Sequence, residues 1–443
     1  MNTIIGMVLV LGVIILVHEW GHFIAARFFG VRVDVFSIGF GPRLFGIKRG
    51  ATDWRVSALP LGGYVRMAGQ DITDIDSGEE APKGLPDELM SKKRWQRAVI
   101  SFAGPAVNLL FPIVLLGGYY VIAGVPYAKF LRRPVVVNEF SAAHSVAVNG
   151  LEAGDKVVLL NGTKNPNWEQ ALKVLNQTSP GGTVSVEVEN GGTARQLNLP
   201  VPNDPRTPVY GYEPILPTIG EVAAGAPASR AGLQVGDVIR SVDGQNVAYW
   251  DQFVEHVRGS GGKPLKVEVD RKGQMVDLTI TPKQGLGEVT DKNFQIGVLP
   301  HVDFVHDRVG PVEAVRSATI TTGQYITGTF TVLGKLFTGQ LSVKQLQSVV
   351  GISRAAGQAV AEGVETVIDF MVLISVNLGI LNLLPIPILD GGHILLLSLE
   401  GIRRRDFSLA FKERFIQVGL VFLLVLFAYV MYNDVVRLLP SHS

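Results

Sequence analysis

A short run near the start of the chain has the residue types of a metal site: His18, Glu19, Trp20, Gly21 and His22. On a helix, His18 and His22 project from the same face one turn apart, so both imidazoles can bind one metal ion. Glu19 follows the first histidine and can reach a water molecule at that ion. The spacing is typical of zinc with a glutamate as general base, because zinc acidifies water and a nearby carboxylate can accept the proton.

Two histidines at this spacing also occur on the surface of soluble helices, where they have no common function. Here, however, residues 4–17 are all apolar or glycine, and the two histidines and the glutamate follow directly. Ionisable groups at membrane depth are costly unless they are partnered, and they usually mark a functional site. The motif therefore predicts a metal site inside a membrane-spanning helix.

The composition indicates a chain in which membrane spans alternate with soluble domains. Of 443 residues, 47% are hydrophobic and 18% are charged, and the net charge is +1. This balance is too apolar for an ordinary soluble protein and gives no support for a nucleic-acid partner. There is no cysteine, so any zinc must be held by histidine and carboxylate.

Four stretches are long and apolar enough to cross a bilayer: residues 4–29, 98–123, 367–384 with an apolar continuation to 399, and 415–431. The first lacks the basic leader and cleavage site of a signal peptide, so we expect it to stay in the mature protein. Lys and Arg are concentrated in the two loops that precede the second and the fourth stretch, which predicts that these loops are cytoplasmic. The termini and the long central segment then lie outside, and the metal motif lies in the cytoplasmic half of the bilayer.

Residues 31–70 read as short strands separated by Gly and Pro, which indicates a small sheet against or within the cytoplasmic face of the membrane. An exposed edge strand there could hold an extended substrate by strand addition. A cytoplasmic hairpin without a substrate role is the alternative. Residues 71–97 are predicted to be a cytoplasmic loop, and residues 98–124 the second span. In that span Asn108 must find a hydrogen-bond partner within the bundle, and we expect its role to be structural.

The central region contains an internal repeat with an offset of 82 residues. GLEAGD at 150–155 recurs as GLQVGD at 232–237, NG at 161–162 recurs as DG at 243–244, and Trp168 recurs as Trp250. Each copy reads as strand, turn, strand, turn, helix and two further strands, so we predict two tandem domains at residues 128–202 and 206–284.

The stretch ASRAGLQVGDVIRSVDGQNV in the second copy is similar to the core of a bacterial PDZ domain, and the first copy resembles a more divergent one. PDZ domains commonly bind peptide C-termini by strand addition. Whether either copy binds a peptide or only crowds the entrance to the site stays open. In the second copy, Tyr210, Gly211 and Tyr212 are predicted to precede the carboxylate-binding strand.

Residues 305–362 have amphipathic helical spacing and are predicted to be an outer linker that either lies on the membrane surface or packs against the repeated domains. Residues 365–400 form the third membrane segment, and 414–434 the fourth. The third segment contains NLLPIPILDGGH at 382–393, where prolines and glycines would open the helix.

Two histidines leave a catalytic zinc one protein ligand short, and Asp390 at this helix break is predicted to be the third. Asn382 could donate to a developing oxyanion or to the substrate backbone. His393 is expected to be packed near the site rather than to bind the metal.

HEWGH, FSIGFG, GPAVN, two PDZ-like copies and NLLPIPILDGG, in this order, resemble the site-2 protease family of intramembrane zinc metalloproteases. The resemblance implies four transmembrane helices, a membrane-associated β-sheet and two tandem PDZ domains of α+β fold. It implies that His18, His22 and Asp390 bind Zn²⁺ and that Glu19 is the catalytic base. It further implies substrate-binding positions at Asn382, Pro385, Pro387, Gly39, Phe40 and Gly41.

The resemblance also implies a multi-pass protein of the bacterial inner membrane with its PDZ domains in the periplasm. Such an enzyme would cut the transmembrane segment of an anti-sigma factor after a first protease has acted, in an envelope stress response, and could also clear remnant signal peptides. Two other classes of protein remain as alternatives. A membrane-anchored PDZ adaptor would gain nothing from the intact metal motif, and a metal transporter would need more polar residues in its spans than Asn108 and Asn377.

Overall fold

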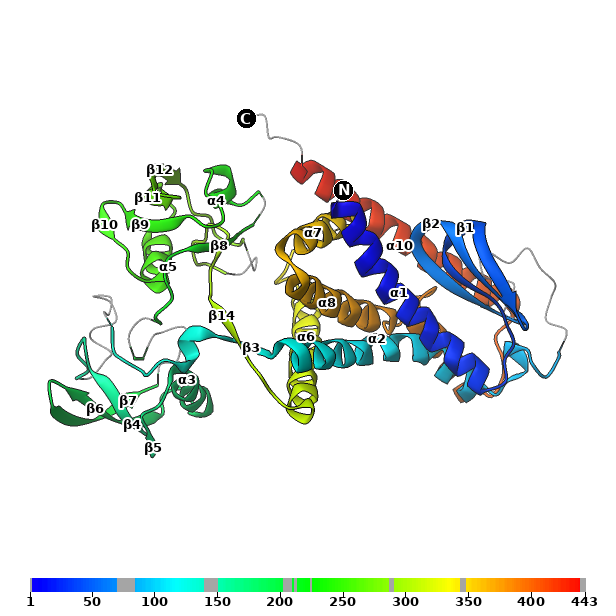
Figure 1. Ribbon diagram of the computed structural model, residues 1–443. Coiled ribbons are helices and arrows are strands. Elements are labelled where there is room, and N and C mark those ends of the chain that lie inside the picture. The colour runs from blue at the N-terminus through cyan, green and yellow to red at the C-terminus, as the bar shows by residue number, and fades with distance from the viewer. Residues whose placement is uncertain are drawn as a thin grey trace. The chain divides into compact units, whose positions relative to one another are not determined.

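The computed structural model describes residues 2–69, 84–138, 150–201, 209–210, 213–223, 225–286, 291–342 and 348–438. The chain forms two compact units (Figure 1). The first unit combines Met1–Val125 with Arg308–Ser443, and the second is Pro126–Asp307.

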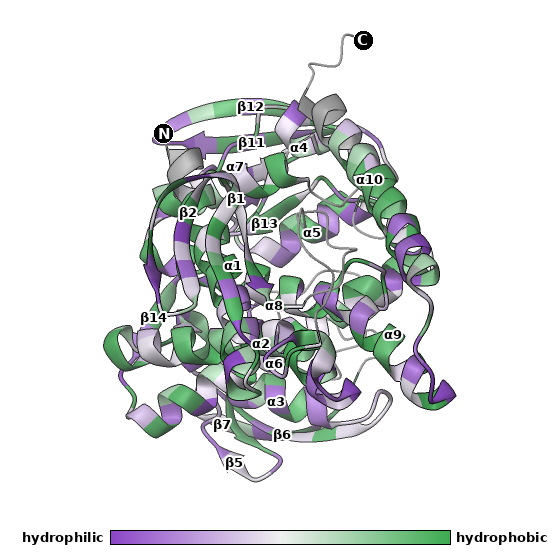
Figure 2. Ribbon diagram, turned by 90° about the vertical axis from the view of Figure 1, so that its right-hand side faces the viewer, coloured by the Kyte–Doolittle hydropathy of each residue, from purple (hydrophilic) through white to green (hydrophobic). Residues whose placement is uncertain are grey.

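The first unit contains, among the described residues, four helices long and apolar enough to cross a membrane. They are α1 (Asn2–Phe28), α2 (Arg94–Ala123), α8 (Val364–Asn382) and α10 (Leu409–Leu438). Hydrophobic residues cover most of α10, for example (Figure 2). The four helices coincide with the four predicted stretches, because about 20 apolar residues are what a helix needs to cross the hydrocarbon core.

Two more long helices follow the second unit in the chain, α6 (Pro311–Phe337) and α7 (Val349–Glu362). The first packs on α2 and α8, and its Thr329 hydroxyl donates to Asn377 Oδ1 at 2.7 Å. The second packs on α1, where a Cβ at Gly6 would lie 2.5 Å from the carbonyl oxygen of Ala356. The region predicted as an outer linker thus forms two helices that pack against the candidate membrane-spanning helices.

A small sheet flanks α1 (Figure 1). It is made of β1 (Val33–Arg49) and β2 (Thr52–Met67), which pair antiparallel. Residues 35–38 pair twice, with residues 63–66 on one side and with residues 53–56 on the other. The short strands expected from the sequence are therefore joined into two long, bent strands. The first part of β1 lies between the first and the last part of β2. Phe45 and Ile47 of this sheet are 65% and 68% exposed.

The two sequence repeats have the same topology in the second unit. The sheets run in the order β5-β4-β6-β7 and β10-β9-β11-β12, and each has a helix, α3 or α5, between its second and third strands in sequence. The first repeat contains β4 (Lys156–Leu160), β5 (Thr163–Lys164), α3 (Trp168–Gln177), β6 (Thr183–Asn190) and β7 (Thr193–Pro200). The second contains β9 (Val238–Val242), β10 (Gln245–Asn246), α5 (Trp250–Gly259), β11 (Leu265–Arg271) and β12 (Gln274–Ile280).

The remaining described elements are short. They are β3 (Val125–Ala128), β8 (Ile219–Val222), β13 (Val298–Pro300), β14 (Phe304–Asp307), α4 (Pro227–Arg230), η1 (Leu89–Ser91) and η2 (Lys129–Arg132). Strand β8 pairs with β13, and β3 pairs with β14.

The assignment of Tyr210 to the second repeat is wrong. Val209 and Tyr210 are buried in the hydrophobic core of the first repeat, where the Tyr210 ring lies edge-on to Trp168 at 6.5 Å. The large aromatic side chain fills space over Trp168, and this burial decides to which repeat the segment belongs. Gly211 and Tyr212 lie outside the described residues.

Each repeat carries a buried aspartate that binds an arginine from the last strand pair. Asp155 is held by Arg195, and Asp237 is held by Arg271 through two hydrogen bonds of 2.7 and 2.8 Å. Asp237 is 1% exposed and also accepts from the backbone N–H of Gln234. The aspartate in each GD turn therefore ties the start of a strand to another strand of its sheet, β7 in the first repeat and β11 in the second.

We predict that Asp237→Ala destabilises the second repeat by roughly 2 kcal/mol, because Arg271 loses two charge-assisted hydrogen bonds. Hydrogen exchange of the β9 to β12 amides in the full-length protein would measure this as faster exchange. Asp270→Ala is the matched control, because it removes an aspartate whose partner Arg240 is exposed. Equal exchange in both variants would contradict the structural role of Asp237.

Candidate metal centre

The two histidines of the motif are buried where α1 crosses α2. His18 and His22 are 7% and 8% exposed. The helices approach so closely that a Cβ at Gly21 would lie 2.5 Å from the carbonyl oxygen of Ala103. A Cβ at Gly104 would lie 2.3 Å from Nε2 of His22. The glycine of the GPAVN motif is therefore required to make room for the His22 ring.

Asp390 reaches the histidines because the third membrane segment breaks, as the sequence predicted. Helix α8 ends at Asn382, and α9 (Asp390–Arg403) begins at Asp390 itself. A Cβ at Gly391 would lie 2.3 Å from the Leu383 carbonyl oxygen, so the new helix starts directly against the loop. Ile388 has a φ of 78°, a strained conformation for a β-branched residue that costs about 1–3 kcal/mol. Backbone strain is thus concentrated two residues before the carboxylate.

The three side chains meet at distances that suit one zinc ion. Nε2 of His18 lies 3.2 Å from Nε2 of His22 and 3.2 Å from Oδ2 of Asp390. Nε2 of His22 lies 3.4 Å from Oδ1 of Asp390. Ligands about 2.0–2.1 Å from a tetrahedral zinc are about 3.3 Å apart, so the spacing fits that ion. Two imidazoles and a carboxylate are also a donor set that catalytic zinc accepts.

The other ring nitrogen of His22 is already engaged. Nδ1 of His22 lies 2.8 Å from the carbonyl oxygen of Ile100, to which it can only donate a proton. The proton on Nδ1 leaves the lone pair on Nε2 free for a metal. The backbone of α2 thus sets the tautomer of this ligand.

Glu19 is half-buried and lies between the metal cluster and the sheet. A Cβ at Gly63 would lie 3.4 Å from Cγ of Glu19, and the carboxylate accepts from the backbone N–H of Val65. Gly63 pairs with Ile38, directly before the GFG motif. The structure therefore brings Gly39, Phe40 and Gly41 to the part of the sheet next to Glu19.

The GFG residues themselves form a bend in β1 rather than part of the metal cluster. Gly39 and Gly41 have φ values of 91° and 85°, and a Cβ at Gly39 would lie 2.7 Å from the Leu59 carbonyl oxygen. The Phe40 ring stacks on Tyr64 at 6.0 Å. Glycine is needed at Gly39 both for its conformation and for close approach of the neighbouring strand.

The remaining predicted site residues differ in their distance from the cluster. Nδ2 of Asn382 lies 3.4 Å from Nε2 of His18, so this amide faces the metal position. Pro387 packs on α10, where a Cβ at Gly419 would lie 2.4 Å from its Cβ, and Pro385 is exposed in the loop. Within the described part of the chain, the side chains that converge on the metal position are those of His18, His22 and Asp390, and His393 is not among them.

Sequence reasoning missed the contact between Asn108 and His18. Its carboxamide is 0% exposed and lies 3.2 Å from Nδ1 of His18. The expectation of a partner within the bundle is confirmed, but that partner is a candidate metal ligand. Ile100, Gly104 and Asn108 follow one another at intervals of four, a spacing that puts them on one face of α2.

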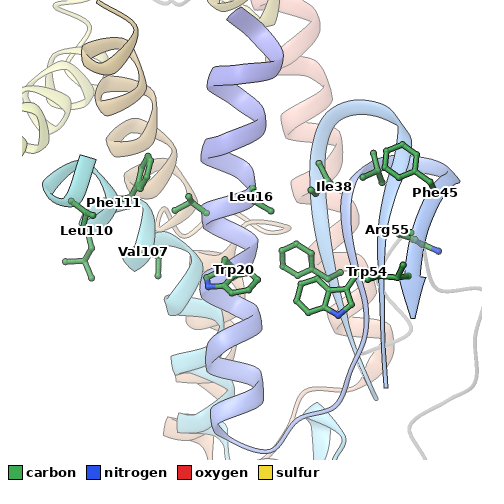
Figure 3. Close-up of a pocket in the computed structure, with 15 residues that line it drawn as sticks. Leu16, Trp20, Ile38, Phe45, Trp54, Arg55, Val107, Leu110 and Phe111 are labelled. Carbon is green, nitrogen blue, oxygen red and sulfur yellow. The ribbon is translucent and has the colours of Figure 1, made fainter. Parts of the chain in front are cut away.

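A large apolar groove is lined by α1, α2 and the sheet (Figure 3). Its volume is about 940 Å³, and Leu16, Val17 and Trp20 line it from α1. Other walls come from α2 and from the sheet, including Leu110, Phe111, Ile38 and Trp54. Neither histidine of the motif nor Asp390 is among the residues that line this groove.

Comparison with known proteins agrees with this arrangement. The model of peptidase family M50 matches residues 6–426. The regulator of sigma-E protease RseP of Salmonella typhimurium (strain 14028s / SGSC 2262) is 34% identical over 452 residues, which cover 97% of this chain and 98% of that protein. RseP of Escherichia coli K12 has the same identity and coverage, and the protease RseP of Yersinia pestis is 33% identical over 98% of this chain and 99% of its own.

The M50 match extends from the first membrane helix, which carries both histidines, to the last, and it includes Asp390. Enzymes of this family are zinc metalloproteases of the site-2 type. Because the match covers nearly the whole chain, this protein belongs to peptidase family M50 and is a zinc metalloprotease.

Proposed function

We propose that the enzyme hydrolyses peptide bonds inside the transmembrane segments of other proteins. The observation that carries this proposal is the position of the ligand cluster. His18 and His22 are buried within α1, a helix apolar enough to span the bilayer, ten and six residues before its last residue, Phe28. A substrate must therefore bring its scissile bond to membrane depth.

In this proposal His18, His22 and Asp390 hold the zinc ion, and each remaining polar group has a separate task. When bound, zinc lowers the pKa of water and polarises a carbonyl group. Glu19 accepts the proton of the attacking water at its carboxylate and passes it to the departing amide nitrogen. Asn382 donates from Nδ2 to the carbonyl oxygen as negative charge develops on it.

The sheet addresses the main obstacle to cleavage within a membrane. A transmembrane helix keeps its carbonyls in hydrogen bonds, so the scissile segment must unwind before attack. Residues 63–67 of β2 pass next to Glu19, and the Val65 N–H points to its carboxylate. An extended substrate that pairs with this part of the sheet would be held unwound beside the catalytic base.

The substrate class follows from the relatives. Two of the three nearly full-length relatives above are named regulator of sigma-E protease, so we infer that this enzyme acts on an anti-sigma factor already shortened by a first protease. Remnant signal peptides, which are also single apolar spans, fit the same site. We further infer that the protein lies in the bacterial inner membrane with both repeats in the periplasm. As PDZ-type domains, they would exclude substrates with large outer domains or bind peptide C-termini.

Cleavage of matched single-span substrates in detergent or liposomes tests the proposal. A span with a central Asn-Pro or Gly-Gly pair should be cut at least about tenfold faster than an all-leucine span. Proline alone destabilises a helix interior by about 3 kcal/mol, so such a span unwinds at a lower free-energy cost. Mass spectrometry of the products should place the cut inside the span. Cleavage only in soluble segments, or equal rates for both spans, would contradict the proposal.

A further inference from the structure

One face of α2 touches both candidate histidine ligands, but it serves them differently. Ile100 supplies a carbonyl oxygen to Nδ1 of His22, and Gly104 makes room for that ring. One turn further, the Asn108 carboxamide lies 3.2 Å from Nδ1 of His18. The nearest Asn108 atom is the amide nitrogen Nδ2, and Oδ1 is buried without a hydrogen-bond partner among the described residues.

The position of Nε2 determines what His18 needs from Asn108. Nε2 of His18 lies 3.2 Å from both His22 Nε2 and Asp390 Oδ2, so it is the atom aimed at the metal position. A neutral imidazole that uses the Nε2 lone pair carries its proton on Nδ1, and that proton needs an acceptor. An amide nitrogen cannot accept it, whereas the amide oxygen can.

We propose that Asn108 is a positioning residue for the metal ligand His18, with its Oδ1 turned to accept the Nδ1 proton. The oxygen and nitrogen of a carboxamide have nearly the same shape, so this orientation requires only a half-turn of the amide. It gives His18 the same kind of acceptor that Ile100 gives His22. It thereby fixes the tautomer that leaves Nε2 free for zinc. The inference rests on the proposed role of His18 as a zinc ligand.

Asn108 is itself held in place from a third helix. The Ser375 hydroxyl of α8 donates to the Asn108 carbonyl oxygen at 2.8 Å, and both residues are 0% exposed. This contact fixes the backbone that carries the amide. Helix α8 also carries Asn382 at its end, so the same helix supports the ligand through Asn108 and faces the metal position directly.

The test measures zinc affinity by competition with a chelator in the full-length, detergent-solubilised protein. Asn108→Leu keeps a similar size but offers no acceptor, and its zinc affinity should fall about 10–100-fold. Asn108→Asp keeps an acceptor oxygen and should bind zinc within about threefold of wild type. Asn377→Leu removes another membrane-embedded asparagine, whose partner is Thr329, and should leave the affinity unchanged.

The absorption spectrum of the Co²⁺-substituted protein provides a second readout that follows ligand geometry rather than activity. It should shift in Asn108→Leu and return towards wild type in Asn108→Asp. Wild-type affinity in Asn108→Leu would overturn the proposal, as would equal losses in the Leu and Asp variants. Failure of wild type to bind zinc would overturn the proposed function as well. Normal zinc binding in wild type, together with no effect of Asn108→Leu on zinc affinity, would overturn the role of Asn108 alone.

Discussion

Replacing Glu19 by glutamine is expected to reduce substrate cleavage by roughly 10²–10⁴-fold, the usual contribution of a general base. Glutamine has nearly the same shape as glutamate, and its amide oxygen can still accept from the Val65 N–H. Only the ability to take a proton from water is lost. Because Glu19 is not one of the three converging ligand side chains, zinc content should stay at the wild-type value.

Cleavage of a single-span substrate and zinc content would be measured on the same Glu19→Gln preparation. Glu313→Gln is the matched control, because Glu313 lies on α6 and is 50% exposed at its side chain. We expect the control to cleave at the wild-type rate. Glu19→Gln protein that retains zinc and cleaves normally would remove Glu19 from the mechanism.

Gly104→Ala is expected to have an effect almost as large although it adds one methyl group. The new Cβ would lie 2.3 Å from Nε2 of His22 and within 2.8 Å of two further ring atoms, so the imidazole must leave its position. Movement of α2 is opposed by its close crossing with α1 at Gly21. We predict at least about a 100-fold loss of zinc affinity, and a matching loss of cleavage.

Gly118→Ala provides the matched control on the same helix. A Cβ at Gly118 meets nothing within 4 Å, and alanine favours a helix over glycine, so this variant should bind zinc and cleave as wild type does. Comparing the two variants by chelator competition separates the local clash from any general effect of alanine in α2. Equal zinc affinity in both would show that His22 is not held as described.

The convergence of His18, His22 and Asp390 could be predicted because its signals are local. His18 and His22 share a face by helical periodicity alone. Asp390 is recognisable because it is a carboxylate within an apolar segment, next to prolines and glycines that break the helix. The membrane-spanning helices were predictable for the same reason, since length and hydropathy suffice. The repeat was visible because its turn residues recur at one offset.

The supporting contacts were not predictable, because they depend on which faces of distant segments meet. Nothing in the sequence shows that Asn108 faces His18 or that the edge of β2 reaches Glu19. The arginine partners of Asp155 and Asp237 lie 40 and 34 residues further along the chain, so they do not align in the two copies. Sequence position alone predicts the wrong repeat for Tyr210, because its burial over Trp168 places it in the core of the first repeat.

Zinc content, measured by elemental analysis on purified full-length protein, tests the central claim most directly. We expect about one zinc ion per chain in wild type, and almost none when His18, His22 or Asp390 is replaced by alanine. Because the chain has no cysteine, no thiolate can take over the ion. Wild-type protein without zinc, or an Asp390→Ala variant that keeps it fully, would contradict the assignment of these three residues as the metal centre.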